Sequence, residues 1–175
     1  MNAPVNAFVA ARDTLIRHRA DYASAVQQFH WPRMEHFNWA LDYFDDLARG
    51  NDATGLIIAG DDGEHRATFA ELSRRSNQVA NHLRQLGVKR GEAIMLMMGN
   101  EIPLWETMLA AIKLGTPFIP CSVLLTQVDL EERMARSGAR HVVTHVNYAE
   151  RFGAAQGIRV CSGTDTPPAG WVAHN

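Results

Sequence analysis

The sequence has few cysteines and no excess of charge of either sign, and each absence excludes a class of protein. Only Cys121 and Cys161 are present, far apart and outside any zinc-ligand spacing. This pattern favours free thiols in a reducing compartment, by default the cytosol, over a disulfide framework. The 17 basic and 19 acidic side chains nearly cancel, so neither nucleic acid nor an anionic membrane surface is indicated as a partner.

Long apolar runs are also lacking. No stretch approaches the roughly 20 apolar residues of a membrane span, and residues 1–20 have no apolar segment followed by a small-residue cleavage site. The chain is nevertheless 46% hydrophobic over 175 residues. A chain of this length buries about 70% of the surface that its unfolded form exposes, which predicts one domain, or one domain with appendages, with a core of its own.

The first 36 residues are predicted to form an N-terminal helix and a linker. Apolar side chains recur every seven positions from Phe8 to Phe29, which indicates one amphipathic helix over residues 4–29. Docking of this helix on the domain's own surface is favoured. A coiled-coil dimer is the alternative, disfavoured because Arg12 and Arg19 occupy intervening seam positions.

Two local patterns follow the linker. Asn38 is placed to cap a helix that continues to Arg49 and ends at Gly50. The stretch "GLIIAGDDGEHRATF" then has an apolar run, a turn signal at Asp61-Asp62-Gly63 and a returning strand, which predicts a β-hairpin.

The rest of the chain alternates between helices and strands. Two capping boxes, Thr68 with Glu71 and Thr126 with Asp129, begin helices, and "QLGV", "KLGT" and "RSGA" are three helix-to-strand corners with glycine at the left-handed position. Between them lie apolar runs typical of covered strands, "EAIMLMM", "PFIP" and "RHVVTHV". The fold class predicted is α/β, with a largely parallel sheet flanked by helices over residues 37–163 and a flexible tail over 164–175.

The candidate reactive residues have structural explanations. Cys121 follows the "PFIP" strand, where open α/β sheets place ligands, but a buried structural thiol is favoured over a nucleophile because no activating base is evident. A small independent enzyme using Cys121 or Ser122 has little support. His141 and His145 are spaced like a helical zinc pair, yet in a strand four residues span about 13 Å, too far for one ion.

Two glycine-containing stretches do not predict a nucleotide site. Gly99 stands alone after its strand, so a dinucleotide fingerprint is weak. "CSGTDTPPAG", residues 161–170, most resembles a phosphate cradle, but Asp165 has the wrong charge, Pro167 and Pro168 remove two donors, and the stretch contains no lysine. An exposed turn is the favoured interpretation.

From about Phe37 to Val146 the sequence resembles the beginning of the AMP-forming acyl-CoA synthetases, in the superfamily of adenylate-forming enzymes. The resemblance rests on "FNWALDYFDDLA", on "ATFAELSRRSNQVANHLRQLGVKRGEAIMLMMGNEIPLWETMLAAIKLGTPFIP" and on "LLTQVDLEERMARSGARHVVT". "FNWA" and "WETMLAAIKLG" are most similar to the medium-chain and aromatic-acid subgroup. The resemblance implies a partial N-terminal domain of the acyl-CoA synthetase fold.

It also implies a function. Such enzymes join a carboxylic acid to ATP with release of pyrophosphate, and the coenzyme A thiol then displaces AMP from the acyl adenylate. The family's phosphate loop, adenine and ribose contacts and adenylation lysine lie later in its chain, so the resemblance assigns no catalytic, cofactor-binding or metal-binding residue here. ATP, Mg and CoA are implied for a full-length enzyme and none for this segment.

As an isolated chain the segment is therefore expected to be inactive. Its expected partners are the remainder of the enzyme chain or a second copy of itself, with a small carboxylic acid as substrate of the full enzyme. A non-catalytic binding or interaction module that reuses the fold is the alternative.

Overall fold

The computed structural model describes residues 3–61 and 63–174, which belong to two compact units, residues 1–46 and 47–175. The sequence places the first boundary ten residues earlier, at 36/37. The first unit contains helices α1 (Ala3–Arg17) and α2 (Tyr22–Gln28) and the π-helical segment η1 (Trp39–Phe44), and α3 (Asp45–Ala48) begins at its end. No helix in the described part of the chain has both the length and the hydropathy to span a membrane.

The single helix predicted over residues 4–29 is wrong. The chain leaves the helical conformation after Arg17 and re-enters it at Tyr22, because the Asp21 side chain accepts a hydrogen bond from the Ser24 N–H at 3.1 Å and caps a new helix. Tyr22 is 84% exposed, so the seven-residue repeat is not one buried face.

The second helix predicted in this unit is confirmed, with a different first turn. Asn38 caps it, and its Oδ1 accepts the N–H groups of Ala40 and Leu41 at 3.1 Å. The first turn is π-helical and the helix ends at Ala48.

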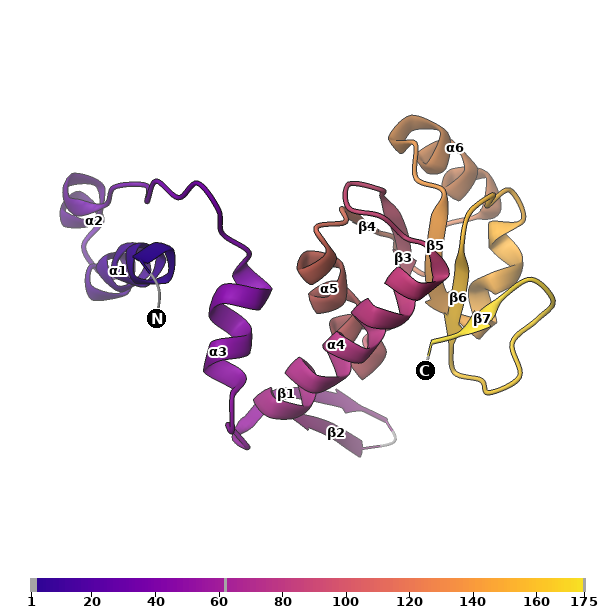
Figure 1. The fold of residues 1–175 in the computed structure, drawn as a ribbon, viewed down its shortest axis with the longest axis horizontal. Coiled ribbons are helices and arrows are strands. Elements are labelled where there is room, and N and C mark those ends of the chain that lie inside the picture. The colour runs from indigo at the N-terminus through magenta and orange to yellow at the C-terminus, as the bar shows by residue number, and fades with distance from the viewer. Residues whose placement is uncertain (1–2, 62, 175) are drawn as a thin grey trace. The chain divides into compact units, whose positions relative to one another are not determined.

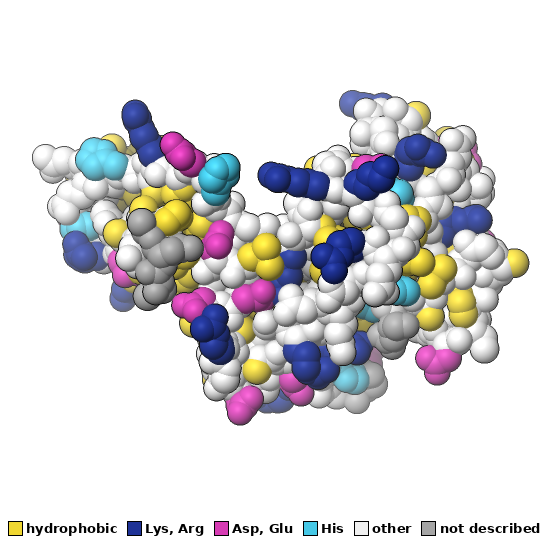
Figure 2. Space-filling view, in the orientation of Figure 1, with side chains coloured by type: hydrophobic (Ala, Val, Ile, Leu, Met, Phe, Trp, Pro, Cys, Tyr) yellow, Lys and Arg dark blue, Asp and Glu magenta, His cyan; other side chains and the backbone are white. Residues whose placement is uncertain are grey.

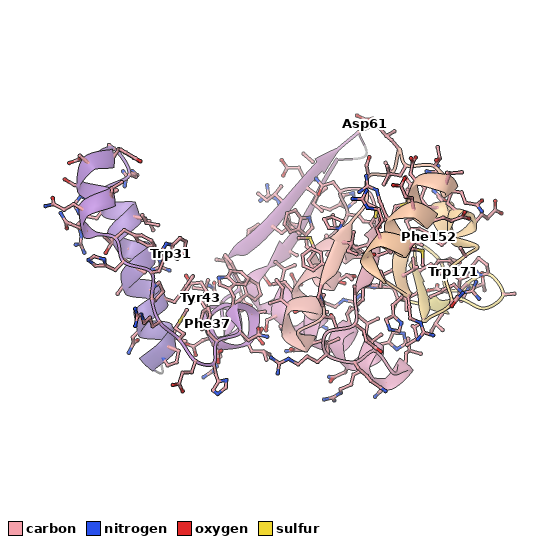
Figure 3. The ribbon with its side chains drawn as sticks, turned by 90° about the horizontal axis from the view of Figure 1, so that it is seen from above. Trp31, Phe37, Tyr43, Asp61, Phe152 and Trp171 are labelled. Carbon is pink, nitrogen blue, oxygen red and sulfur yellow. The ribbon has the colours of Figure 1, made fainter. Side chains whose placement is uncertain are left out.

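Aromatic contacts hold this unit together. The Phe8 ring centroid lies 5.2 Å from that of Phe37 and 5.0 Å from that of Tyr43. Figure 3 labels Phe37 and Tyr43.

The second unit opens with the predicted hairpin. Strand β1 (Thr54–Gly60) pairs antiparallel with β2 (Gly63–Thr68). Asp62 of the predicted turn lies outside the described residues. Three helices follow, α4 (Phe69–Leu86), α5 (Ile102–Leu114) and α6 (Gln127–Ser137), and the residues that end them, Gly87, Gly115 and Gly138, are all left-handed as predicted. Both predicted capping boxes are present.

The core of this unit is a five-stranded parallel sheet in the order β4-β3-β5-β6-β7, which confirms the predicted fold class. Its strands are β3 (Ile94–Met97), β4 (Phe118–Pro120), β5 (His141–His145), β6 (Arg159–Ser162) and β7 (Val172–Ala173), and the 3₁₀ segment η2 (Val146–Phe152) follows β5. The flexibility expected of residues 164–175 stays a prediction. Within that range, β7 pairs with β6, and Figure 3 shows Trp171 beside Phe152, with 6.5 Å between their ring centroids.

Helices cover both faces of the sheet (Figure 1). Along β3, Ile94 and Leu96 pack with α4 and α5, whereas Met95 and Met97 pack with α6 and η2. Alternate side chains of a strand point to opposite faces, so a strand between two helical layers is apolar throughout. This explains why all four residues of β3, "IMLM", are apolar.

Figure 2 shows acidic and basic side chains intermingled on the surface in view.

Candidate functional site

The strand order places a candidate site at the carboxyl ends of β3 and β5. From β3 the chain crosses to β4 on one side through α5, and it later returns to β5 on the other side. Loops that leave neighbouring strands in opposite directions open a crevice at this point, where doubly wound sheets bind their ligands. The residues there are Gly99–Glu101 after β3 and His145 at the end of β5.

Glu101 is the residue that precedes α5, and its side chain makes no capping hydrogen bond to the helix. The side chain is half-buried, and burial raises the pKa of Glu101. His145, the Ser162 hydroxyl and the Gly99 backbone oppose this rise. The carboxyl group therefore lies near His145 at the end of β5 and Ser162 at the end of β6.

His145 has a fixed tautomer in its neutral form. Its Nδ1 accepts a hydrogen bond from the Asn147 N–H at 3.2 Å, which leaves the proton on Nε2. The ring lies against the backbone of Gly163, and a Cβ at that position would collide with Nε2. Gly163 also has a left-handed φ of +80°, so glycine is required there on both grounds.

Ser162 completes the cluster. It pairs in register with His145 across β5 and β6 and is buried. Its Oγ makes no hydrogen bond of good geometry among the described residues, although the hydroxyl lies near enough to the Glu101 carboxyl group to oppose the rise of its pKa. Because His145 Nδ1 is already occupied and Nε2 carries the proton, the imidazole is not a base for this hydroxyl. The cluster therefore offers hydrogen-bonding groups to a ligand and is not an activated nucleophile.

A cavity of about 410 Å³ opens beside Glu101. It is lined by the hairpin residues Ile58, Ala59, Gly60 and His65 and by residues 100–103 of the loop that begins α5. This volume lies within the range of small-molecule pockets, and an apolar wall with a few polar groups is their usual composition. The described residues contain no group of three or more side chains arranged to hold a metal ion.

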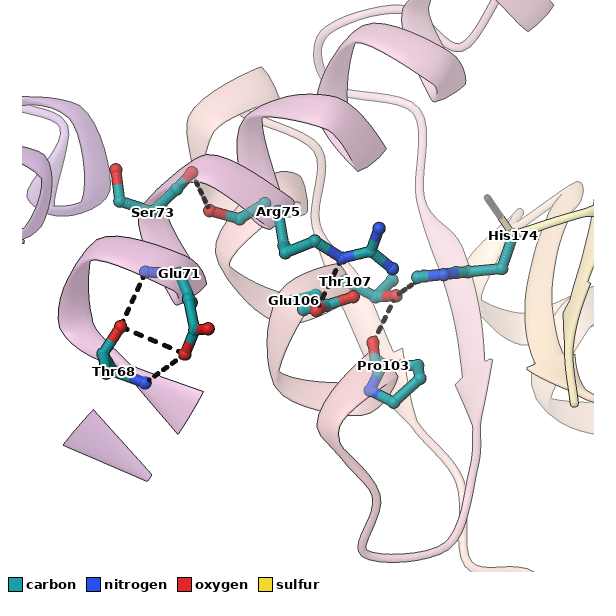
Figure 4. A network of polar contacts seen from close by, with 9 residues as sticks. Thr68, Glu71, Ser73, Arg75, Pro103, Glu106, Thr107 and His174 are labelled. Carbon is teal, nitrogen blue, oxygen red and sulfur yellow. Dashed lines mark hydrogen bonds and ion pairs between the residues drawn. The ribbon is translucent and has the colours of Figure 1, made fainter. Parts of the chain in front are cut away.

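A buried polar network fixes α5, which carries Glu101 at its start. Arg75 Nε of α4 donates to Glu106 Oε1 at 3.2 Å, and Glu106 is 3% exposed. Thr107 Oγ1 donates to the Pro103 carbonyl at 2.7 Å and lies 2.8 Å from His174 Nε2, so the imidazole N–H donates to the hydroxyl (Figure 4). The network ties α5 to α4 and to the residue after β7.

The residues singled out in the sequence lie elsewhere or have structural roles. Cys121 is buried as predicted, its Sγ lies 3.5 Å from the Ile119 carbonyl, and burial raises the pKa of its thiol, which opposes nucleophilic use. Ser122 is exposed, and its Oγ accepts the Leu124 N–H at 3.2 Å.

The two histidines of β5 point to different environments, in agreement with the exclusion of a zinc pair. His141, at the amino end of the strand, has Nε2 3.1 Å from Glu92 Oε2 and accepts the Ile158 N–H through Nδ1. In the stretch 161–170, Cys161 and Ser162 are buried in β6, and residues 163–170 form the largely exposed loop to β7 that was expected.

Sequence patterns did not indicate Glu101 or Ser162. Each is an isolated polar residue at the end of an apolar strand, a weak signal that a single sequence does not separate from an ordinary loop. Only the parallel pairing of β3, β5 and β6 brings these strand ends together.

Comparison with known proteins identifies the family. Residues 44–171 match the model of the AMP-binding enzymes. Feruloyl-CoA synthase from Amycolatopsis is 33% identical over 109 residues, which cover 58% of this chain and 22% of that protein. The mitochondrial acyl-coenzyme A synthetase ACSM3 of Mus musculus is 29% identical over 133 residues, 71% of this chain and 23% of that protein.

Solved structures show the same fold. A benzoate CoA ligase from Burkholderia xenovorans superposes with a TM-score of 0.63 at 28% identity, covering 75% of this chain and 27% of that one. The acyl-CoA synthetase of Brucella canis gives a TM-score of 0.75 at 22% identity, and the superposition covers 86% of this chain and 30% of that one. The chain spans about a quarter of the length of these relatives. It belongs to the AMP-binding enzyme family and corresponds to the N-terminal segment of an adenylate-forming acyl-CoA synthetase.

Proposed function

We propose that this chain is the N-terminal part of an AMP-forming acyl-CoA synthetase, which converts a carboxylic acid, ATP and coenzyme A into acyl-CoA, AMP and pyrophosphate. The observation that carries the proposal is the family match over residues 44–171. The relatives described above, named as CoA synthases, synthetases and ligases, support it.

Within such an enzyme this segment supplies scaffold and not chemistry. The sequence contains only two lysines, Lys89 and Lys113. Lys89 lies in the turn between α4 and β3, and Lys113 is buried in α5, where Nζ donates to the Ser73 carbonyl at 3.3 Å and to Asn77 Oδ1 at 2.9 Å. Neither stands at the carboxyl ends of the strands, so the segment offers no lysine for adenylation.

The donor set at the sheet's carboxyl edge does not fit a nucleoside triphosphate. Phosphates bind to cations and to free backbone N–H groups, whereas this edge presents the Glu101 carboxyl group and the exposed Asp165. ATP, Mg and CoA are therefore proposed for a full-length enzyme, and none is assigned to this segment. The isolated chain is expected to be inactive. Its two buried free thiols support a reducing compartment, for which we propose the cytosol.

A non-catalytic binding module is the second candidate. The cavity beside Glu101 favours it, because a pocket of this size with one half-buried carboxyl group suits a small ligand without any catalytic group. In this case the chain functions without a complementary segment.

An exchange assay separates the two. The purified chain is incubated with ATP, a medium-chain or aromatic acid and labelled pyrophosphate, and label in ATP is measured, with the intact feruloyl-CoA synthase of Amycolatopsis and ferulate as positive control. We expect no exchange and no ATP binding by the chain. Exchange by the chain alone would contradict the scaffold role, and ATP binding without exchange would favour the module.

The coding sequence after residue 175 provides a second test. An in-frame Thr/Ser/Gly-rich loop ending in Pro-Lys, followed by a further large segment, is the expected result. A stop codon at that point would favour the module.

A further inference from the structure

Glu101 has a half-buried carboxyl group, and within the described part of the chain it forms no ion pair with a lysine or arginine. Burial raises the pKa of Glu101, because the ionised form loses hydration in a partly dry site. The groups that oppose this rise are the His145 imidazole, the Ser162 hydroxyl and the Gly99 backbone. A cationic ligand would neutralise the charge of the ionised form.

The Ser162 hydroxyl is a second buried group beside this carboxyl group. Ser162 is 4% exposed, and its Oγ makes no hydrogen bond of good geometry with the described residues. A buried hydroxyl in this condition costs free energy. Its proton can go to the Glu101 carboxylate while its lone pairs still accept hydrogen bonds. A ligand group that only donates therefore suits both residues at once.

Glu101 also lines the cavity of about 410 Å³ described above. Apart from a histidine, it is the only ionisable residue among the described residues of this wall. Much of the remaining wall is apolar and comes from Ile58 and Ala59 of the hairpin and from Ile102 and Pro103 of α5. Such a cavity matches a ligand that has an apolar body and a single positive charge.

We propose that this cavity binds a small organic cation, a primary ammonium group on an aliphatic or aromatic body, with the Glu101 carboxylate as its counter-ion. An ammonium group has three N–H donors and no acceptor. It donates to the Glu101 carboxylate and to Ser162 Oγ, and the body lies against the apolar wall. A carboxylate of the same shape is repelled by Glu101. The inference rests on the binding role proposed for this cavity and not on the synthetase activity.

Three ligands with the same body test the proposal on the wild-type chain. Hexylamine, hexanol and hexanoate are titrated by calorimetry at about pH 8, where amines and carboxylic acids are both charged. Hexylamine is expected to bind with a Kd in about the millimolar range, at least about tenfold more tightly than the other two. Equal binding of hexylamine and hexanol, or tighter binding of hexanoate, would overturn the proposal. Neither result would change the expected absence of pyrophosphate exchange.

Two sources can supply the ammonium group, a free amine and the lysine side chain of a polypeptide. Nα-acetyl-lysine methylamide, titrated in the same way, distinguishes them. Tighter binding of this lysine than of hexylamine would assign the site to a polypeptide side chain, and the reverse order would assign it to a free amine. Both results support an ammonium site.

A matched pair of variants locates the charge. Glu101→Gln is expected to raise the Kd for hexylamine about tenfold or more. Glu150→Gln removes the same charge from an exposed position of η2 outside the cavity and should leave the Kd unchanged. Circular dichroism checks that both variants fold. An equal Kd for Glu101→Gln and the wild type would mean that amines bind to the acidic surface in general, and the proposal would be wrong.

The pKa of Glu101 gives a readout that needs no variant. A cation beside a carboxyl group favours its ionised form, so saturating hexylamine is expected to lower this pKa. Carbon-13 NMR of the Glu101 carboxyl carbon over a pH series measures it, with hexanol as control. A pKa that hexylamine leaves unchanged would contradict contact between the ammonium group and Glu101 and would overturn the proposal.

Discussion

The two compact units of this chain are stabilised in different ways. In residues 1–46, only Val5, Ala40 and Phe44 are buried hydrophobic residues among those described, and ring contacts around Phe8 provide much of the packing. In residues 47–175, both faces of a parallel sheet are buried under helices. The family match, residues 44–171, covers the second unit from its first residue and almost none of the first unit. Units with little buried apolar surface open at low free energy, so we expect the first to unfold before the second.

The largest expected effect is in the sheet. Leu96→Ala removes a fully buried side chain from the centre of β3 and is expected to lower the free energy of unfolding of the second unit by about 2 to 5 kcal/mol. Urea denaturation followed by circular dichroism measures it. Leu41→Ala, at an exposed position of η1, is the control and should change the midpoint of this transition little; equal effects of the two variants would remove the contrast between the units.

A smaller effect is expected at the corner between α5 and β4. Gly115 has a φ of +67°, so Gly115→Val is expected to cost about 1 to 2 kcal/mol in the same denaturation experiment. A Cβ there would also lie 3.2 Å from the Arg90 side chain, which is flexible enough to move. Gly99→Ala is the matched control, because Gly99 is not left-handed and nothing lies within 4 Å of its Cβ position. An unchanged midpoint for Gly115→Val would contradict a strained corner.

The third-largest loss of stability is expected at the N-terminal cap of α6. Thr126 Oγ1 accepts the Asp129 N–H at 3.3 Å, and the Asp129 carboxylate accepts the Thr126 N–H at 2.9 Å. Thr126→Ala is expected to cost about 1 kcal/mol in thermal or urea unfolding, and Thr126→Ser should retain most of that stability. A loss as large as that of Leu96→Ala would mean that α6 and not the sheet limits unfolding.

The same cap predicts a dependence on pH. Hydrogen bonds from Thr126 lower the pKa of Asp129 below its ordinary 3.8. The stabilisation is therefore present above that value and is lost as the pH falls through the lower pKa of the folded state. Midpoints at about pH 7 and about pH 3 should differ more for the wild type than for Thr126→Ala. Equal differences would show that this cap contributes nothing to acid sensitivity.

The smallest effect is expected in the first unit. Tyr22 begins α2 and is 84% exposed, so Tyr22→Ser should change the unfolding of either unit by no more than about 0.5 kcal/mol. Near-ultraviolet circular dichroism and urea denaturation measure it. A loss of several kcal/mol would mean that Tyr22 is buried in solution and would weaken the comparison.

Signals that act over a few residues were predictable from the sequence. The capping boxes at Thr68 and Thr126 and the glycine corners need only neighbours three or four positions away, and all of them form. The broken N-terminal helix was not predicted, because a repeat of seven outweighed the cap at Asp21. The cap prevailed in the structure because this helix buries too little surface to continue through it.

The candidate site depends on contacts that no local signal encodes. Glu101, His145 and Ser162 are separated by dozens of residues and meet only because β3, β5 and β6 run in the same direction side by side. The rule that ligands bind at the carboxyl ends of such strands directed attention to Cys121 instead. The strand order instead places the expected ligand site at the crevice between the carboxyl ends of β3 and β5.

The contact between Thr107 and His174 has a spectroscopic consequence. A hydroxyl group has one proton, and Thr107 gives it to Pro103, so the imidazole must supply the other and is restricted to the Nε2–H form. The two ring nitrogens of His174 should therefore give widely separated nitrogen-15 signals in place of one averaged pair. In a nitrogen-15-labelled chain, the merging of those signals would report the release of the last strand from α5 at this one residue.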